Sequence, residues 1–118
     1  MATCSKAGLP ISCLLFNARS VVDKIDYLAC RLGDHFASIV LVTETWLSEC
    51  IPNSFLSFGG TYQIFRKDRI ATVGGGVMAL VEKNLTVCPV VLPDIYSSLE
   101  LLCLDVIVSH LNLRVIVG

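Results

Sequence analysis

The sequence has little charge and no long hydrophobic run, and these two shortages exclude several classes of protein. Charged residues make up 16% of the 118 residues, and nine Lys and Arg against ten Asp and Glu give a formal net charge of -1. Without a basic excess there is no global field that attracts nucleic acid, so any DNA contact must come from a local cluster. No apolar stretch approaches the roughly 18 residues of a membrane-spanning helix, and no signal peptide is recognisable before Pro10. We therefore expect no membrane partner.

The six cysteines lack the spacing of a metal or redox motif. None forms a C-x-x-C pair, and several lie in apolar runs, where a free thiol behaves as a small hydrophobic side chain. We expect reduced thiols, with a disulfide framework or a zinc site as the alternative. Reduced thiols favour an intracellular location, in nucleus or cytoplasm, over secretion.

Apolar residues are abundant, at 54%, and their arrangement predicts a βαβ unit near the start of the chain. Residues 11–16 form a short apolar run typical of a buried strand. Ser20 is a candidate N-cap for a helix over residues 21–32, and Gly33 is a candidate C-cap. The β-branched run 38–43 predicts a central strand. A strand, helix and strand within about thirty residues place the two strands parallel, with their carboxyl ends at one edge of the sheet.

The rest of the chain predicts more strands, separated by Gly, Asn or Pro-Asp turns and arranged as a meander. A helical turn is expected over residues 51–56. The last stretch, Leu111 to Gly118, is strand-like with no turn or polar tail after it, so we expect the chain to stop within the fold. The domain prediction is a tail over 1–10 and a partial α/β domain with a mixed sheet over 11–118. The predicted strands cover residues 62–65, 77–81, 86–92, 99–108 and 112–117.

Asn17 and Glu44 follow the two predicted parallel strands directly, so they should meet at one edge of the sheet. This edge is where open α/β sheets bind ligands. A carboxylate directly after a run of apolar strand residues is costly to bury unless it is paired or bound to a metal. One carboxylate with an amide neighbour suits Mg²⁺, which keeps several waters and takes few protein ligands. The alternative is that both residues are ordinary caps and turn residues.

Three ordered blocks resemble the endonuclease domains of non-LTR retrotransposons, in the exonuclease III-like and AP-endonuclease-like endonuclease/exonuclease/phosphatase family. The first is a strand ending in Asn17 before a helix, and the second is a strand ending in Glu44-Thr45-Trp46-Leu47. The third is Tyr62 to Arg69, followed by Gly74-Gly75-Gly76 and a strand. Together they span nearly the whole chain from Ile11 onward.

The resemblance implies a fold, a chemistry and roles for particular residues. The fold would be the N-terminal part of a layered α/β sandwich, with two packed mixed β-sheets flanked by helices, here incomplete. Glu44 would be the catalytic metal ligand and Asn17 its catalytic neighbour, with Mg²⁺, or alternatively Mn²⁺, as cofactor. In the complete domain the partner would be DNA. The family's active-site Tyr, Asp-x-Asn motif and terminal Asp-His pair are not found in this sequence.

Arg66, Lys67 and Arg69 are the only tight basic cluster, and we expect them in an exposed turn near the rim that carries Glu44. They could contact DNA phosphates or form a solvated turn. Family members usually carry a basic residue just before the glycines, where this chain has Thr72 and Val73. The glycine run is expected to be a bulge or a tight start of a strand, because no Gly-Lys-Ser/Thr of a P-loop follows.

Several other residues could take part in chemistry, and each has a plainer interpretation. Glu100 and His110 could serve as a general base, but no partner is visible in the sequence for His110, which is more typical of a surface or satisfied histidine. Trp46 is expected to pack beneath the rim rather than to stack on a base.

Two functional hypotheses follow. The first is part of a Mg²⁺-dependent endonuclease that nicks target DNA for retrotransposition, with a phosphatase or lipid phosphodiesterase as the variant within the family. The second is a catalytically incomplete remnant with residual metal or DNA binding. Under either hypothesis, we expect the chain alone to be inactive, to leave an inner sheet face uncovered, and to self-associate through an open sheet edge.

Overall fold

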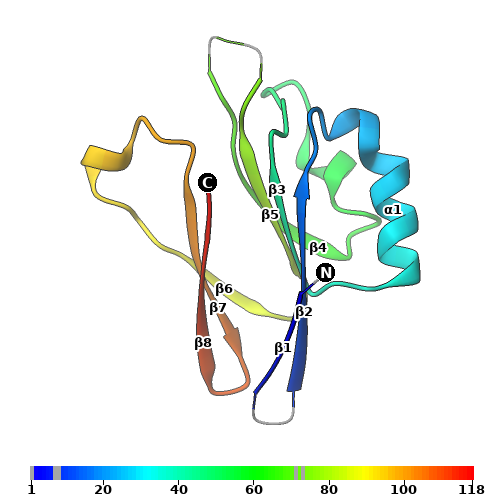
Figure 1. Cartoon of the computed structure of the whole chain (residues 1–118). Helices are drawn as coiled ribbons and strands as arrows, with labels where there is room; N and C mark the ends of the chain where they lie inside the picture. The colour runs from blue at the N-terminus through cyan, green and yellow to red at the C-terminus, as the bar shows by residue number, and fades with distance from the viewer. Residues whose placement is uncertain (1, 7–8, 71, 73) are drawn as a thin grey trace.

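The computed structural model describes residues 2–6, 9–70, 72 and 74–118, which form two β-sheets and one long helix (Figure 1). The elements in chain order are β1 (Ala2–Lys6), β2 (Leu9–Asn17), the 3₁₀ turn η1 (Val22–Lys24), α1 (Ile25–Asp34), β3 (Ile39–Thr43), the 3₁₀ turn η2 (Asn53–Leu56), β4 (Tyr62–Lys67), β5 (Val77–Glu82), β6 (Thr86–Pro89), the 3₁₀ turn η3 (Asp94–Tyr96), β7 (Leu102–Val108) and β8 (Leu111–Val117).

The first sheet has five strands in the order β1-β2-β3-β5-β4 and contains the predicted βαβ unit. Strands β2 and β3 are parallel, in a register that pairs Asn17 with Thr43.

The predictions of Ser20 as N-cap and Gly33 as C-cap of the helix were wrong. Helix α1 begins at Ile25 after a 3₁₀ turn, and it continues through Gly33 to Asp34, where the His35 amide donates to the Arg31 carbonyl. Ser20 has a φ of 80°, in place of the extended backbone that is typical of an N-cap, so it does not cap this helix.

The meander predicted for the second half of the chain is only partly present. Strand β5 pairs antiparallel with both β4 and β3, so it inserts into the middle of the first sheet. Only β6, β7 and β8 form a meander, as a separate three-stranded antiparallel sheet. Strand β5 is an internal strand, as β3 is, which agrees with the burial of its side chains on both faces of the sheet.

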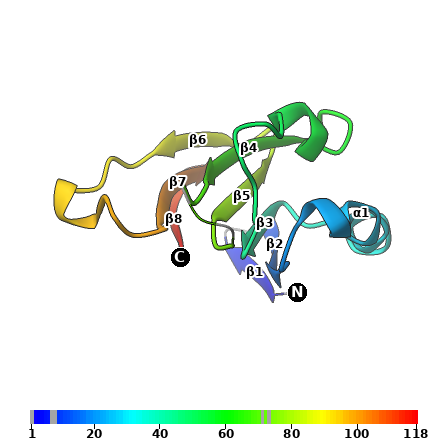
Figure 2. The ribbon, with the colours of Figure 1, turned by 90° about the horizontal axis from the view of Figure 1, so that it is seen from above.

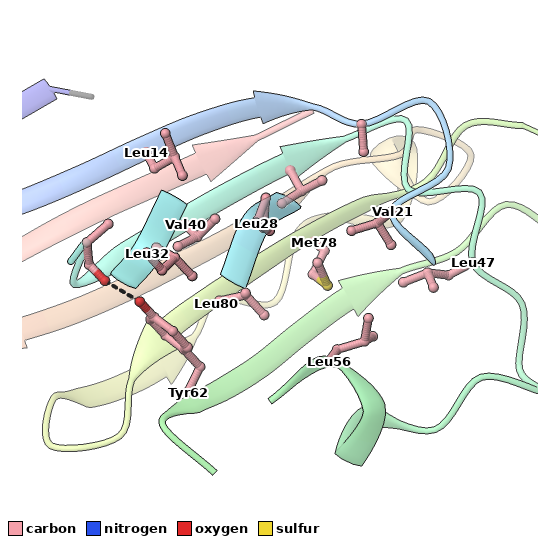
Figure 3. Packing of buried hydrophobic residues seen from close by; sticks show 13 residues of the cluster. Leu14, Val21, Leu28, Leu32, Val40, Leu47, Leu56, Tyr62, Met78 and Leu80 are labelled. Carbon is pink, nitrogen blue, oxygen red and sulfur yellow. Dashed lines mark hydrogen bonds between the residues drawn. The ribbon is translucent and has the colours of Figure 1, made fainter. Parts of the chain in front are cut away.

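Helix α1 covers one face of the first sheet, and the second sheet covers the other (Figures 1 and 2). On the helical side, Leu28 and Leu32, one helical turn apart, pack against the sheet in a continuous core. Tyr62 closes this core, and its hydroxyl donates a 2.6 Å hydrogen bond to the Ala37 carbonyl (Figure 3). Burial, and secondarily the nearby Glu82 carboxylate, raises the pKa of Tyr62 to about 12, so the hydroxyl stays a donor. The labelled side chains of this core are Leu14, Val21, Leu28, Leu32, Val40, Leu47, Leu56, Tyr62, Met78 and Leu80.

The core between the two sheets confirms the predicted layered sandwich. It joins alternate residues of β3 and β5 to alternate residues of β7 and β8, as expected of two sheets packed face to face. The coverage is uneven, because Leu41 on β3 is buried whereas Leu15 on β2 is 70% exposed. The buried members of this core are Ile39, Leu41, Val77, Ala79, Val81, Leu104, Val106, Val108 and Val117.

The segment expected as an N-terminal tail contains a strand instead. Residues Ala2 to Lys6 form β1, which pairs antiparallel with β2, with Lys6 opposite Leu9 and Ala2 opposite Cys13. Strand β2 therefore begins at Leu9 rather than at Ile11 and is flanked on both sides. Among the described residues, none of the helices has the length and apolar character needed to cross a membrane.

Candidate functional site

Three strands end, and one begins, along a single row at one edge of the first sheet. Asn17 is paired with Thr43, Thr43 with Val77, and Val77 with Lys67. Glu44 follows Thr43 directly, so the register puts Asn17 and Glu44 at the same edge. The alternation of β2 puts Asn17, which is exposed, on the face that carries Ile11 and Cys13 and packs toward the second sheet.

The carboxylate of Glu44 is held through one of its two oxygens. Trp46 Nε1 donates to Glu44 Oε2 over 2.8 Å, and the Gly75 amide donates to the same oxygen over 2.9 Å. These two hydrogen bonds, first that of Trp46 and then that of Gly75, hold the pKa of Glu44 below its usual value, with a smaller contribution from the Arg69 charge. Glu44 is therefore a carboxylate at neutral pH, and among the described residues no donor contacts its Oε1.

Three loops are joined at this edge by backbone hydrogen bonds. The loop after β2 bonds to the loop after β3, with Ser20 donating to the Glu44 carbonyl and Val21 to the Thr45 carbonyl. The loop after β3 bonds in turn to the glycine run, since Trp46 donates to the Gly75 carbonyl over 2.9 Å. These hydrogen bonds between the three loops fix the backbone on both sides of Glu44.

Backbone strain concentrates in these loops. Glu44 and Trp46 each have a φ of 54°, and Arg19 and Ser20 have φ values of 46° and 80°. A side-chain-bearing residue in this left-handed region costs on the order of 1 to 3 kcal/mol, and such residues cluster at functional sites. The strain at Glu44 supports the interpretation that this edge is a site rather than an ordinary turn.

The backbone amides of the glycine run, Gly74 to Gly76, bind carboxylates of this chain and do not form a P-loop for phosphate. The Gly75 amide donates to Glu44, and the Gly76 amide donates over 2.6 Å to Glu100 Oε2. Gly74, Gly75 and Gly76 have φ values of 99°, 66° and 87°. A Cβ at Gly76 would also overlap the Thr45 hydroxyl, which is fully buried without a hydrogen-bond partner among the described residues. The expected tight start of β5 is therefore present, and it requires glycine.

Arg66 is not in the exposed turn where we expected it. It lies in β4, and its side chain is only 13% exposed and forms an ion pair with Asp68. Its guanidinium also donates to the Ile51 carbonyl over 2.7 Å and to the Ser48 carbonyl over 2.8 Å. Arg66 fixes the loop after Leu47 to the end of β4, because its planar fork of donors is engaged by acceptors of this chain.

Lys67 and Arg69 do lie on the rim of Glu44, but both contact the segment before β7. Lys67, the last residue of β4, donates from Nζ to the backbone carbonyls of Ser97 and Leu99. Arg69 is exposed in the following loop, and its Nε donates to Glu100 Oε1 over 2.5 Å. The structure therefore brings Asn17, Glu44, Lys67 and Arg69 to one edge, whereas the Arg66 side chain, which comes from β4, bonds to the neighbouring loop after Leu47.

The residues at this edge fit a Mg²⁺ ion in part. Glu44 is ionised and, within the described residues, has one oxygen without a donor. Mg²⁺ binds through one or two carboxylates while it keeps several waters. Within the described part of the chain, no group of three or more His, Cys, Asp and Glu side chains forms a ready-made metal cage. Glu44 could hold the ion only together with waters, a substrate oxygen or a further ligand.

Sequence reasoning missed three parts of the site. Trp46, expected to pack beneath the rim, is 40% exposed and bonds to Glu44 through its ring nitrogen. Glu100, considered as a general base, is bonded to Gly76 and Arg69. The glycine amides carry no side-chain signal, although the spacing of Glu44 and Trp46 by two residues could have suggested that the side chains meet.

A scan against models of known protein families found no match, and a search of curated proteins also found none. Solved structures are similar in fold. One is a 3′ phosphatase, NExo, from Neisseria, bound to a product DNA hairpin, with a TM-score of 0.66 and 18% identity over 90% of this chain. Another is an AP endonuclease from Archaeoglobus fulgidus, with a TM-score of 0.67 and 13% identity over 88% of this chain.

This chain spans 40% of the length of the first structure and 39% of the second. Both structures are of DNA-processing enzymes, and the similarities cover 90% and 88% of this chain. The chain therefore shares an α/β sandwich fold with the matching parts of these two structures.

Proposed function

We propose that this chain carries part of the active site of a Mg²⁺-dependent DNA endonuclease, with Glu44 as a metal ligand and Asn17 as its catalytic neighbour. The observation that carries the proposal is the Glu44 carboxylate. It is strained, ionised, held among the described residues through Oε2, and located where the parallel strands β2 and β3 end. An ordinary turn residue needs none of these features.

Each residue at the edge has a definite part in the proposed chemistry. When bound, Mg²⁺ would supply positive charge that polarises a phosphodiester oxygen and stabilises the negative charge that develops on it. Glu44 would hold the ion, while Trp46 and Gly75 fix the Oε2 oxygen of the carboxylate. Asn17 offers an amide that can donate to a phosphate oxygen or accept from water. Mn²⁺ is the alternative ion, since it also prefers oxygen ligands.

The proposed substrate is DNA, which both the fold and the resemblance to retrotransposon endonucleases support. Hydrolysis would leave a nick with a 3′-hydroxyl that a reverse transcriptase could extend. In this proposal Arg69 and Lys67 add positive charge beside the scissile phosphate while they remain bonded to the segment before β7. Arg66 contributes indirectly, by fixing the neighbouring loop.

The second candidate function is metal or DNA binding without catalysis. One observation favours it: this sequence contains no Asp-x-Asn pattern. The retrotransposon endonucleases that the sequence resembles carry this motif in their active site. In this alternative Glu44 still binds a divalent ion, but no water is activated at the rim.

Two parallel assays test the proposal. Manganese binding is measured by the loss of the free Mn²⁺ electron paramagnetic resonance signal, with Mg²⁺ as competitor, for the wild type and for Glu44→Gln. Supercoiled plasmid nicking is measured on the same samples. Binding that Mg²⁺ displaces and Glu44→Gln removes supports the metal site. Nicking that Glu44→Gln abolishes supports the enzyme, whereas binding without nicking is the result expected of this chain by itself under either candidate. Equal binding by wild type and Glu44→Gln would contradict both.

A further inference from the structure

Glu100 connects the second sheet to the residues that hold Glu44. It lies two residues before β7, yet both of its carboxylate oxygens bond to the first-sheet side of the molecule. Oε1 accepts from Arg69 Nε over 2.5 Å, and Oε2 accepts from the Gly76 amide over 2.6 Å. Glu100 is ionised, because the hydrogen bond from Arg69 and then that from Gly76 hold its pKa below the usual value.

Adjacent amides of the glycine run thus bond to two different carboxylates. The Gly75 amide bonds to Glu44 and the Gly76 amide bonds to Glu100. The Arg69 side chain lies against Gly75, so closely that a Cβ there would overlap the guanidinium. Neither Gly75 nor Gly76 has a side chain to hold its own position. The direction of the Gly75 amide is therefore set by contacts on its two sides.

The contacts to the segment before β7 extend beyond Glu100. Lys67, at the end of β4, donates to the carbonyls of Ser97 and Leu99. The two cations of the rim, Lys67 and Arg69, therefore both join the first sheet to residues 97–100. This use of the two cations explains why a basic cluster stands here in a chain with no basic excess.

We propose that Glu100 is a positioning residue for Glu44: by bonding to Gly76 and Arg69 it aims the Gly75 amide at Glu44 Oε2, which leaves Oε1 turned outward for a metal. Only the last part of this inference, that Glu44 Oε1 binds a metal, rests on the proposed function. Glu100 does not itself touch the ion. Residues that orient metal ligands in this way typically change metal affinity about 10- to 100-fold when they are replaced.

The test uses the single tryptophan of the chain, Trp46, whose indole bonds to Glu44. The variant Glu100→Gln keeps the shape of the side chain but removes the charge and one of the two acceptor oxygens. The variant Arg69→Gln removes the guanidinium that donates to Glu100 Oε1. Asp34→Asn is the matched control, since it removes one exposed carboxylate at the end of α1.

Two readouts on the full chain separate positioning from mere stability. The first is Trp46 emission without metal or denaturant, where Glu100→Gln and Arg69→Gln are expected to shift the spectrum in the same direction as Glu44→Gln. The second is quenching of Trp46 by Mn²⁺, whose midpoint should rise about tenfold in Glu100→Gln. Asp34→Asn should match the wild type in both.

A purely structural role for Glu100 would lower the urea midpoint of unfolding but leave the native emission and the Mn²⁺ midpoint unchanged, and that result would overturn the proposal. A wild type that Mn²⁺ does not quench would count against the proposed function instead. In that case the metal-free emission still decides whether Glu100 acts on the Trp46–Glu44 pair.

Discussion

Trp46 donates its indole hydrogen to the Glu44 carboxylate two residues earlier, over 2.8 Å, and both residues have a φ of 54°. The left-handed backbone at both positions folds the chain back so that the two side chains meet on the same side. Thr45 between them is fully buried, so the loop is anchored at its centre. This local geometry holds a carboxylate ready at the sheet edge, as a binding site requires.

The indole hydrogen bond can be removed without removing the ring, by the variant Trp46→Phe. Glu44 then keeps only the Gly75 amide, so its orientation is less restricted. We expect Mn²⁺ affinity to fall about tenfold, as measured by the paramagnetic resonance assay, because replacing groups that orient a ligand typically has this effect. The urea midpoint of unfolding serves as the control for folding. An affinity equal to that of the wild type would show that Gly75 alone suffices.

Gly76→Ala should destabilise the protein by about 1 to 3 kcal/mol, because the position has a φ of 87° and the added methyl meets the Thr45 hydroxyl. Gly33→Ala provides the matched control. Gly33 lies inside α1 with nothing within 4 Å of an added Cβ, and alanine there should stabilise the protein by up to about 1 kcal/mol. Urea denaturation measures both variants. Equal effects would contradict the assigned backbone geometry.

The ion pair between Asp105 and Arg114 makes a pH-dependent contribution to stability. Arg114 Nε lies 2.8 Å from Asp105 Oδ1 across strands β7 and β8, and this hydrogen bond holds the pKa of Asp105 below its usual value of 3.8. The contribution is present above the usual pKa and is lost as the pH falls through the lowered one. It is small, because the Arg114 side chain is largely exposed to solvent.

A double-mutant cycle with Asp105→Asn and Arg114→Gln measures this contribution. We expect a favourable coupling free energy of unfolding at pH 7 that weakens below the usual aspartate pKa, and that high salt reduces. A coupling that grows on acidification would have the wrong sign for a carboxylate whose pKa is lowered.

Self-association through β8 follows from its place at the edge of the second sheet. An edge strand offers unpaired backbone donors and acceptors, and Ile116 on β8 is 60% exposed. We expect the wild type to associate and Ile116→Lys to shift it toward the monomer. Size-exclusion chromatography with light scattering measures both, and Ser98→Lys adds the same charge outside the strands. A concentration-independent wild-type monomer would contradict this prediction.

The sequence predicted the fold better than it predicted the site contacts. Apolar runs determined β3 and β5, because burial on both faces leaves a continuous hydrophobic signal. The place of β5 between β3 and β4 could not be predicted, since pairing partners depend on the whole sheet. Strand β1 was missed because Ala2 to Lys6 has a weak strand pattern.

In the candidate site, too, one part could be predicted from the sequence and another part could not. The position of Asn17 and Glu44 at one edge follows from the parallel pairing, which the spacing predicts. Apart from the ion pair between Arg66 and Asp68, the contacts of Arg66 and Glu100 join residues 13 to 31 positions apart in sequence, so no local pattern encodes them. The hydrogen bonds of Gly75 and Gly76 use backbone amides, whose direction depends on folding and not on residue type.

The most direct test of the central claim, that Glu44 at the shared edge of β2 and β3 binds a divalent ion, is paramagnetic broadening by Mn²⁺ in the nitrogen–proton NMR spectrum of the full chain. Substoichiometric Mn²⁺ should first broaden the signals of the Trp46 indole, the Asn17 side-chain amide and the Gly75 amide. In Glu44→Gln the same three signals should stay sharp when Mn²⁺ is added. In the wild type, excess Mg²⁺ should restore them. Broadening centred on another part of the chain, or unchanged in Glu44→Gln, would contradict the account.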